Sequence, residues 1–323
     1  MSRIHVGRQI TTSCVRVFMS RVAVIGVGHL GKQHARLYAE LGHLAGVVDI
    51  LESRANEVAA LYKTTAYTDY RELFGKVDAV SLAVPTTDHA QIGVDLLEHG
   101  IDVLVEKPIA SAREQAEALI KAAQKNKRIL QVGHVERFNP VVIAAREVAT
   151  KPQFFEIHRL AAFSPRSLDI DVVLDLMIHD IDIVLSLVPA AVREVRAVGI
   201  PILSQKADIA NARVEFEDGC VANFTASRVS FEKTRKLRFF QPHDYISVDY
   251  ATQTGLMVSL RMGAVKERKL EPPNEEPLKL ELASFVDCVR TRRMPVVSGE
   301  EGLRALDLAM LINDAIAERL MLR

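Results

Sequence analysis

Short apolar runs and amphipathic segments alternate along the first 130 residues. The apolar runs fall at residues 22–25, 44–48, 79–84 and 103–105, and segments with helical spacing fall at 32–41, 53–62 and 87–99. An unbroken apolar run is typical of a strand buried on both faces, and parallel strands need crossover connections of this length. The pattern predicts a doubly wound parallel sheet with helices on both faces, which is the Rossmann arrangement. Another helix is expected after a capping box of Ser111 and Glu114, with a buried stripe of Ala116, Leu119, Ile120 and Ala123.

The pattern changes in the second half of the chain. A helix is predicted over 173–187, and then Ala212, Val214 and Phe216 alternate with polar residues. Asp218-Gly219 predicts a tight turn, after which 221–229 returns as the partner strand. Further alternation at Ile246, Val248 and Tyr250 precedes closing helices at 278–290 and 300–320. We therefore expect an open-faced, mostly antiparallel sheet with one face covered by helices and the other free for a partner subunit.

Length and composition predict the number of domains and argue against some classes of binding partner. A chain of 323 residues predicts two domains, which we place at 20–133 for cofactor binding and 134–323 for substrate binding and oligomerisation. Residues 1–19 are interpreted as an arm or a start-site artefact. With 41 basic and 41 acidic residues the net charge is zero, which argues against nucleic acid or an anionic membrane as the main partner. No apolar run is long enough to span a bilayer.

The cysteines and histidines argue against a disulfide framework or a metal site. Cys14, Cys220 and Cys288 are widely separated and have no zinc-binding spacing, and the histidines are scattered. We therefore expect a cytoplasmic protein that binds no metal and acts on a small molecule.

A glycine motif follows the first predicted strand and opens the first predicted helix. Gly26, Gly28 and Gly31 form G-x-G-x-x-G in the context that binds a dinucleotide pyrophosphate at a helix N-terminus. Asp49 follows the second strand, 18 residues after Gly31, where a carboxylate binds the adenosine ribose and repels a 2′-phosphate. The motif favours NAD over NADP, although the nearby Arg54 keeps NADP as an alternative. The predicted contacts are Gly26, Val27, Gly28, His29, Leu30, Gly31 and Asp49.

The ends of the next two strands supply further polar groups. Pro85, Thr86 and His89 follow the third strand and are expected to border the nicotinamide half of the cofactor, because ligands bind outside the carboxyl ends of parallel strands. Glu106 and Lys107 follow the next strand and precede a proline, which places two charges at the mouth of the sheet. A solvated strand end is the alternative interpretation.

These motifs resemble those of the glucose-fructose oxidoreductase, inositol dehydrogenase and rhizopine-catabolism (Gfo/Idh/MocA) family. The resemblance spans about residue 20 to the C-terminus and rests on 26–31, Asp49, 106–108, 137–140 and 175–182. It implies an N-terminal Rossmann domain, a C-terminal open-faced sheet domain and NAD as the cofactor. It also implies that Lys107, Asp175 and His179 form the catalytic site.

The helix predicted over 173–187 supports the same residues independently. Asp175, His179 and Asp182 fall on one stripe of a helix that is otherwise apolar, and buried polar groups are costly unless they are paired or face a wet cleft. A core histidine is the alternative, and Asp180 points elsewhere, as a structural or surface group. For alcohol oxidation we expect His179, oriented by Asp175, to be the base. Lys107 would stabilise the alkoxide or take the proton itself, and the sequence leaves the final acceptor open.

The resemblance also guides the choice of substrate. The family acts on sugars and polyols, and many members carry glycines where this chain has residues 163–174, which argues against a simple inositol pocket. This version, with residues 132–138, is similar to the branch that oxidises the 3-hydroxyl of UDP-N-acetylglucosamine and related nucleotide sugars to 3-keto sugars. Expected substrate contacts are His134, Arg137, Asn139, Asp182 and Arg166, the last as a diphosphate ligand or else a surface arginine.

The sequence leaves two other functions open and also indicates an assembly. A polyol or inositol dehydrogenase of the same family, or a non-catalytic NAD-binding regulator, are the alternatives. A homodimer or homotetramer through the open sheet face is expected.

Overall fold

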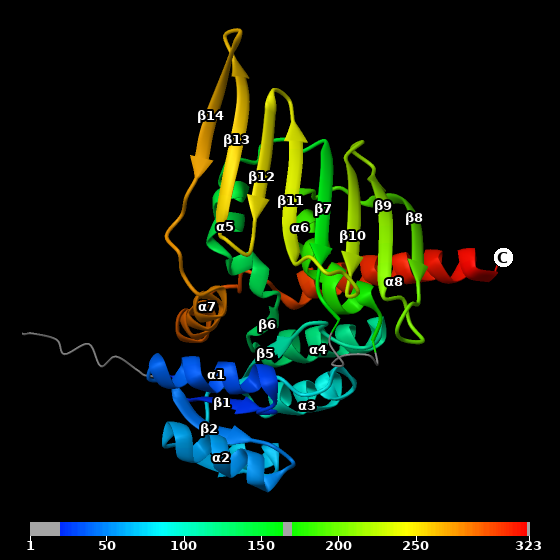
Figure 1. Ribbon diagram of the computed structural model, residues 1–323. Helices are drawn as coiled ribbons and strands as arrows, with labels where there is room; N and C mark the ends of the chain where they lie inside the picture. The colour runs from blue at the N-terminus through cyan, green and yellow to red at the C-terminus, as the bar shows by residue number, and fades with distance from the viewer. Residues whose placement is uncertain (1–19, 164–169, 322–323) are drawn as a thin grey trace, which may run out of the picture.

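The computed structural model describes residues 20–163 and 170–321 and contains two sheets (Figure 1). Arg166, a predicted substrate contact, lies outside the described residues. The first sheet is parallel and has the order β3-β2-β1-β4-β5-β6. Its strands are β1 (Val22–Ile25), β2 (Leu44–Val48), β3 (Thr65–Tyr67), β4 (Ala79–Leu82), β5 (Asp102–Glu106) and β6 (Leu130–Gly133). The predicted doubly wound sheet is confirmed.

Four helices and two short 3-10 turns accompany this sheet. They are α1 (His29–Glu40), α2 (Glu52–Tyr62), α3 (Thr86–Glu98), α4 (Arg113–Asn126), η1 (Tyr70–Leu73) and η2 (Val135–Phe138). The predicted buried stripe of α4 is confirmed, because all four of its residues are buried. The predicted capping box is wrong. The helix begins at Arg113 with Ala112 as its N-cap, and the Ser111 amide donates to Gln115 Oε1 at 3.2 Å.

The second sheet has eight strands in the order β14-β13-β12-β11-β7-β10-β9-β8. The strands are β7 (Phe154–Leu160), β8 (Val192–Ile200), β9 (Ile209–Phe216), β10 (Val221–Ser227), β11 (Thr234–Gln241), β12 (Asp244–Asp249), β13 (Thr254–Arg261) and β14 (Ala264–Leu270). Only β7 and β10 pair in parallel among these described strands, so the expectation of a mostly antiparallel sheet is confirmed. The predicted turn between β9 and β10 contains Gly219 at φ +85°, a conformation that favours glycine.

Helices cover one face of the second sheet and leave the other face open (Figure 1). The remaining helices are α5 (Pro140–Val148), α6 (Ile178–Leu187), α7 (Pro277–Thr291) and α8 (Gly299–Met321). Ala212, Val214 and Phe216 point into the core with α5, α6 and α8, while Arg213 lies on the open face. Within the described part of the chain, no helix combines the length and apolar composition needed to cross a membrane.

The C-terminal segment returns to the first sheet. Leu282 and Phe285 of α7 are buried in the same cluster as Val22 and Val24 of β1. Beside β6, the Val132 amide donates to Val297 O at 3.0 Å. The core around the first sheet therefore includes residues from the C-terminal end of the chain, and the division at 133/134 stays a prediction.

The helix predicted over 173–187 is not a continuous α-helix. A π-helical turn, η3 (Val173–Met177), precedes α6. A π turn contains more residues than an α turn and rotates the side chains before it relative to those after it, and such turns are frequent at functional sites. The stripe that places Asp175, His179 and Asp182 together in an ideal α-helix is therefore broken.

A buried network of charges ties α6 to the sheet. The Arg159 guanidinium of β7 donates to both Asp180 oxygens at 2.8 and 2.9 Å and to Glu136 Oε1 at 3.0 Å. The same guanidinium lies 5.3 Å from the centre of the Tyr250 ring. Asp180 is thus a buried structural residue, which is one of the two roles that the sequence predicts for it. Its pairing with Arg159 fixes the helix that carries the neighbouring His179.

Candidate active site

The glycine turn between β1 and α1 is packed tightly on one side and open on the other. A Cβ atom on Gly31 would lie 1.8 Å from Gly26 O, and one on Gly26, at φ +81°, would lie 2.6 Å from Ala83 O. A Cβ atom on Gly28 would contact nothing within 4 Å. Gly26 and Gly31 are therefore required by the fold itself, whereas the space beside Gly28 is free for a ligand at the N-terminus of α1.

Asp49 links this turn to the end of β2. Its Oδ2 accepts from the Val27 amide at 3.1 Å, and its Oδ1 accepts from the Leu51 amide at 3.0 Å. Arg54 Nη1 lies 3.4 Å from Oδ2, and its side chain is 42% exposed. These contacts fix the carboxylate at the edge of the pocket, where it can bind ribose hydroxyls.

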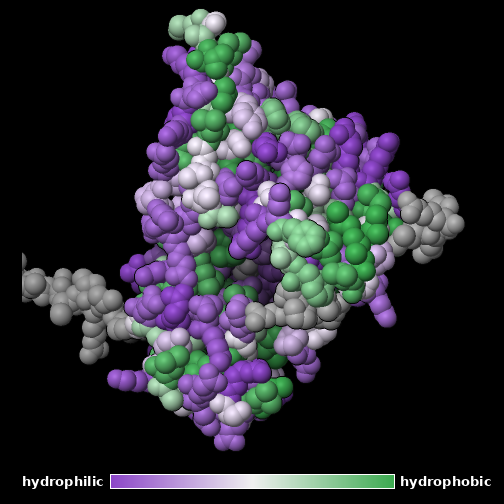
Figure 2. Space-filling model, in the orientation of Figure 1, coloured by the Kyte–Doolittle hydropathy of each residue, from purple (hydrophilic) through white to green (hydrophobic). Residues whose placement is uncertain are grey.

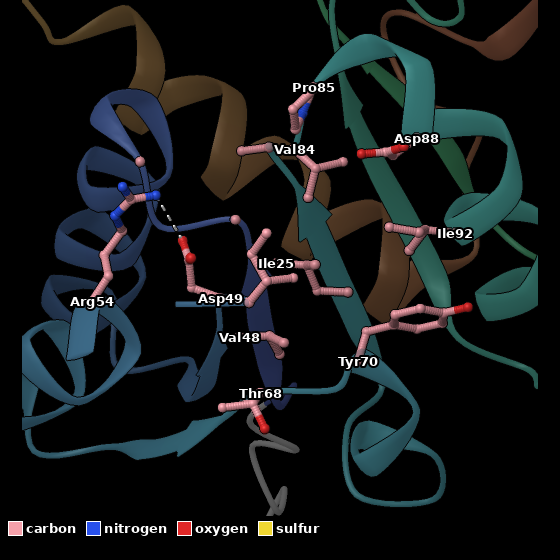
Figure 3. Close-up of a pocket in the computed structure, with 14 residues that line it drawn as sticks. Ile25, Val48, Asp49, Arg54, Thr68, Tyr70, Val84, Pro85, Asp88 and Ile92 are labelled. Carbon is pink, nitrogen blue, oxygen red and sulfur yellow. Dashed lines mark hydrogen bonds and ion pairs between the residues drawn. The ribbon is translucent and has the colours of Figure 1, made fainter. Parts of the chain in front are cut away.

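A cavity of about 470 Å³ opens at the carboxyl ends of β1, β2 and β4 (Figure 3). Its lining includes Gly26, Gly28, Asp49 and Pro85, which the sequence predicts. The motifs did not identify other lining residues, namely Thr68, Tyr70, Asp88 and Ile92. Tyr70 is held by its hydroxyl, which donates to Asp95 Oδ2 at 2.8 Å. No spacing in the sequence links Tyr70 to the glycine turn, because only the sheet brings them together.

The other predicted cofactor residues lie around this cavity in different ways. His29 and Leu30 are exposed in the first turn of α1, and Thr86 begins α3. His89 is buried, and its ring nitrogens lie 3.0 Å from Pro108 O and 3.1 Å from Val84 O. His89 thus braces the two strand-end loops against each other, and its ring does not line the cavity.

Lys107 joins the first sheet to the π turn of the other domain. Its Nζ donates to Asp175 O at 2.6 Å and lies 3.6 Å from Asp175 Oδ1. The two side chains are 16% and 22% exposed, so both reach the cleft. Burial lowers the pKa of Lys107 from its ordinary value of 10.5, and the charges of Asp175 and Glu106 oppose this effect. Lys107 therefore gives up its proton more readily than a surface lysine.

His179 lies within reach of the Lys107 charge. The ring is partly exposed, although Ile178 and Asp180 on either side are buried. Burial lowers the pKa of His179 well below 6.5, and the positive charges of Lys107 and Arg159 lower it further. The ring packs edge-on against His134, with centroids 6.3 Å apart, and burial lowers the pKa of His134 to about 3. Both imidazoles are therefore neutral at physiological pH.

The structure corrects the predicted role of Asp175. Asp175 contacts Lys107, and His179 Nδ1 has no hydrogen-bond partner among the described residues. Because the π turn rotates Asp175 relative to His179, Asp175 orients the lysine rather than the histidine.

Three predicted substrate contacts are used within the protein. Arg137 and Asp182 form a buried pair at 3.4 Å with both side chains 2% exposed, and Arg137 Nη2 also donates to Glu301 Oε1 at 2.8 Å. Burial raises the pKa of Asp182 to about 7 despite this arginine. Asn139 caps α5 through the Val141 amide and donates to Tyr250 O at 3.2 Å. Burial and these partners keep all three out of the cleft, whereas His134, also buried, has both ring nitrogens without a partner among described residues.

The cofactor pocket and the Lys107 group define a class of protein. The surface is hollowed between the second sheet and the helices of the first domain (Figure 2). A dinucleotide pocket with a lysine and a neutral histidine in a cleft is the arrangement of a nicotinamide-dependent oxidoreductase.

Comparison with known proteins identifies the family. The model of the oxidoreductase family with an NAD-binding Rossmann fold matches residues 20–134, and the model of the GFO/IDH/MocA C-terminal domain matches residues 153–259. The chain belongs to the Gfo/Idh/MocA family of NAD-binding oxidoreductases. The predicted family, fold class and cofactor are thereby confirmed.

Individual relatives span nearly the whole chain. UDP-N-acetylglucosamine 3-dehydrogenase of Acidithiobacillus ferrooxidans is 38% identical over 92% of this chain and 97% of its own, and its solved structure superposes with a TM-score of 0.88. A scyllo-inositol 2-dehydrogenase (NAD(+)) of Bacillus subtilis is 27% identical over 91% of this chain and 93% of its own. Levoglucosan dehydrogenase, solved with NADH and levoglucosan, is 17% identical and covers 93% of this chain and 97% of its own with a TM-score of 0.84, a likeness of fold.

Gly28→Ala tests the position of the cofactor. The new methyl group meets no protein atom, so the free energy of unfolding should change by less than about 1 kcal/mol. It would occupy the space of the pyrophosphate, so NADH affinity measured by fluorescence titration should fall at least about tenfold. The control is Gly219→Ala in the other domain, which strains a turn at φ +85° and should leave NADH affinity unchanged. Unchanged affinity in Gly28→Ala would contradict the assigned pocket.

Proposed function

We propose that the enzyme uses NAD to oxidise the 3-hydroxyl of a UDP-N-acetylhexosamine to a 3-keto sugar. The main support is the 38% identity, over nearly the full length of both chains, to a UDP-N-acetylglucosamine 3-dehydrogenase. Lys107 and His179 in the cleft beside the cofactor pocket supply the polar groups that such an oxidation needs. The relatives named for inositol are more distant in sequence.

The oxidation requires a hydride acceptor and a group that takes the hydroxyl proton. NAD, when bound, supplies the hydride acceptor. Lys107 is the better proton acceptor, because its pKa is lowered toward neutral pH whereas that of His179 is lowered to a value at which the ring is a weak base. We therefore assign the proton to Lys107 Nζ, which Asp175 O holds at 2.6 Å, and assign to neutral His179 a hydrogen bond to the substrate oxygen. This assignment reverses the preference for His179 as base that the sequence suggested.

Lys107→Met and His179→Asn test the assignment. Lys107→Met should lower kcat by about 10²- to 10⁴-fold, the usual contribution of general acid–base catalysis, without loss of NADH affinity. In the wild type, oxidation should accelerate as the pH rises and Lys107 loses its proton. This acidic limb should persist in His179→Asn and in the surface control Lys32→Met. An acidic limb that disappears in His179→Asn would make the histidine the base.

A substrate panel tests the proposed sugar. NADH formation should be observed with UDP-N-acetylglucosamine or its galacto epimer, and not with free N-acetylglucosamine or myo-inositol. The chain has no tryptophan, so the emission of bound NADH can be titrated with and without UDP-N-acetylglucosamine. Turnover of inositol alone would favour the polyol alternative. NADH binding without turnover of any sugar would favour a regulator.

The proposal extends to assembly and location. We infer a homodimer or homotetramer through the face of the second sheet that no described helix covers. We place the enzyme in the cytoplasm, because Cys220 and Cys288 are free and buried and do not need an oxidising compartment. Light scattering that reports a monomer at micromolar concentration would contradict the assembly, and fractionation of cells would check the location.

A further inference from the structure

A buried polar cluster adjoins the main chain of Lys107. Its members come from separate elements and are His34 of α1, Ser81 of β4, Glu106 of β5, Gln131 of β6 and Glu281 of α7. Four of them are 0% exposed, and Glu106 is 7% exposed. A dry site with two carboxyl groups is costly unless each group is paired or neutral.

Glu106 has a polar neighbour at each of its oxygens. Its Oε2 accepts from the Lys107 amide at 3.2 Å, and its Oε1 lies 3.1 Å from His34 Nε2. His34 Nδ1 in turn lies 2.8 Å from Ser81 Oγ. A Cβ atom on Gly133 would come within 2.9 Å of the Glu106 carboxyl carbon, so the backbone encloses this group. The Glu106 carboxyl group is therefore held between the main chain of Lys107 and the His34 ring.

Glu281 has no donor for either oxygen among the described residues. Gln131 Nε2 donates to the main-chain oxygen of Glu281 at 3.5 Å, which places the Gln131 amide against Glu281. Gln131 Oε1 also lacks a partner among the described residues. Three buried side-chain oxygens on these two neighbouring residues therefore have no donor among the described residues. A protonated carboxyl group would supply one, because it carries its own O–H donor.

Burial and the neighbouring negative charges also favour the protonated form of Glu281. Burial raises the pKa of Glu281 well above 4.5, and the negative charges of Glu106 and Asp182 raise it further. Tyr38 of α1, which is buried, also interacts electrostatically with Glu281, and Arg137 of η2 is already paired with Asp182. Among the described residues, no cation is positioned to neutralise an ionised Glu281.

We propose that Glu281 is a protonated carboxylic acid in the folded enzyme and donates its hydrogen bond inside this cluster, to Gln131 or Glu106. The Glu106 carboxyl group, which accepts from the main chain of Lys107, then has no ionised Glu281 beside it. Glu281 is thus a positioning residue that acts on Lys107 through Glu106. It is not a proton relay to solvent, because His34, Ser81 and Tyr38 behind it are all fully buried.

Infrared spectroscopy tests the protonation without any substrate. The carbonyl stretching band of a protonated carboxylic acid should be present in wild type at pH 8 and absent in Glu281→Gln. Any contribution from Asp182 is common to both proteins and cancels in the difference spectrum. Absence of the band from the difference spectrum would overturn the proposal. Failure of Glu281→Gln to fold would do the same, since the proposal requires a neutral group of this shape to be accepted.

The pH dependence of unfolding supplies a second test. Because the folded pKa of Glu281 is raised, wild type should lose stability as the pH rises from about 4.5 toward that pKa, and Glu281→Gln should not. The folding equilibrium constant of the variant relative to wild type should therefore grow by on the order of tenfold per pH unit across this window. The control Glu276→Gln alters the exposed N-cap residue of the same helix and should show no such growth. A constant ratio for Glu281→Gln would overturn the proposal.

Kinetic rescue tests the positioning role. With UDP-N-acetylglucosamine and saturating NAD, Glu281→Ala should lower kcat by about tenfold through displacement of Lys107, and Glu281→Gln should restore both kcat and its pH profile. Equal impairment of two folded variants would overturn the positioning role. This measurement rests on the proposed function. If wild type itself does not oxidise the nucleotide sugar, the proposed function fails, while the infrared and unfolding tests still decide the state of Glu281.

Discussion

The contact between Lys107 and Asp175 is the interaction on which the site depends. The lysine ends a strand of the first sheet, and the aspartate lies in the π turn that begins the helical cover of the second sheet. Their 2.6 Å hydrogen bond runs through the main-chain oxygen of Asp175, so it holds the lysine amine without requiring that the carboxylate be fully paired. The amine is thereby kept at the cleft, where burial lowers its pKa.

Buried ion pairs fix α6 to the elements packed around it. Arg159 fixes α6 to the second sheet through Asp180, and Arg137 links the same helix to α8 through Asp182 and Glu301. Removal of one partner from such a pair leaves an uncompensated buried charge, which makes the arrangement intolerant of displacement. His179 precedes these two anchored residues, and it is partly exposed while Ile178 and Asp180 on either side are buried.

The polar side chains of the site fall into two groups, carboxylates that accept hydrogen bonds from the main chain and side chains that are partly exposed. Asp49 is held by main-chain amides after β2, and Glu106 accepts from a main-chain amide at the end of β5. Both carboxylates lie at the carboxyl edge of one parallel sheet, where strand ends and helix N-termini provide donors. Lys107 and His179 differ from them because they are only partly buried, and this exposure makes them available to a substrate.

The sequence alone determined the first domain and its cofactor pocket. Its signals are local features of the sequence. They are continuous apolar strands, a glycine turn at a strand–helix junction and an acidic residue at the end of the next strand. Alternation likewise determined the β9–β10 hairpin. Lys107, Asp175 and His179 were found from spacing and from resemblance to a family.

Only the tertiary structure decided how these residues are used. An ideal helix predicted that Asp182 shares the cleft with His179, but the burial of Asp182 and its pairing with Arg137 exclude it. Asn139 and His89 are polar residues beside motifs, yet burial commits them to caps and loop contacts. No sequence motif identifies Glu281. Its electrostatic neighbour Glu106 lies 175 positions away in the sequence, and only the packing of α7 brings the two residues near each other. Local pattern fixes which elements form, whereas burial and long-range pairing fix which polar groups remain free to act.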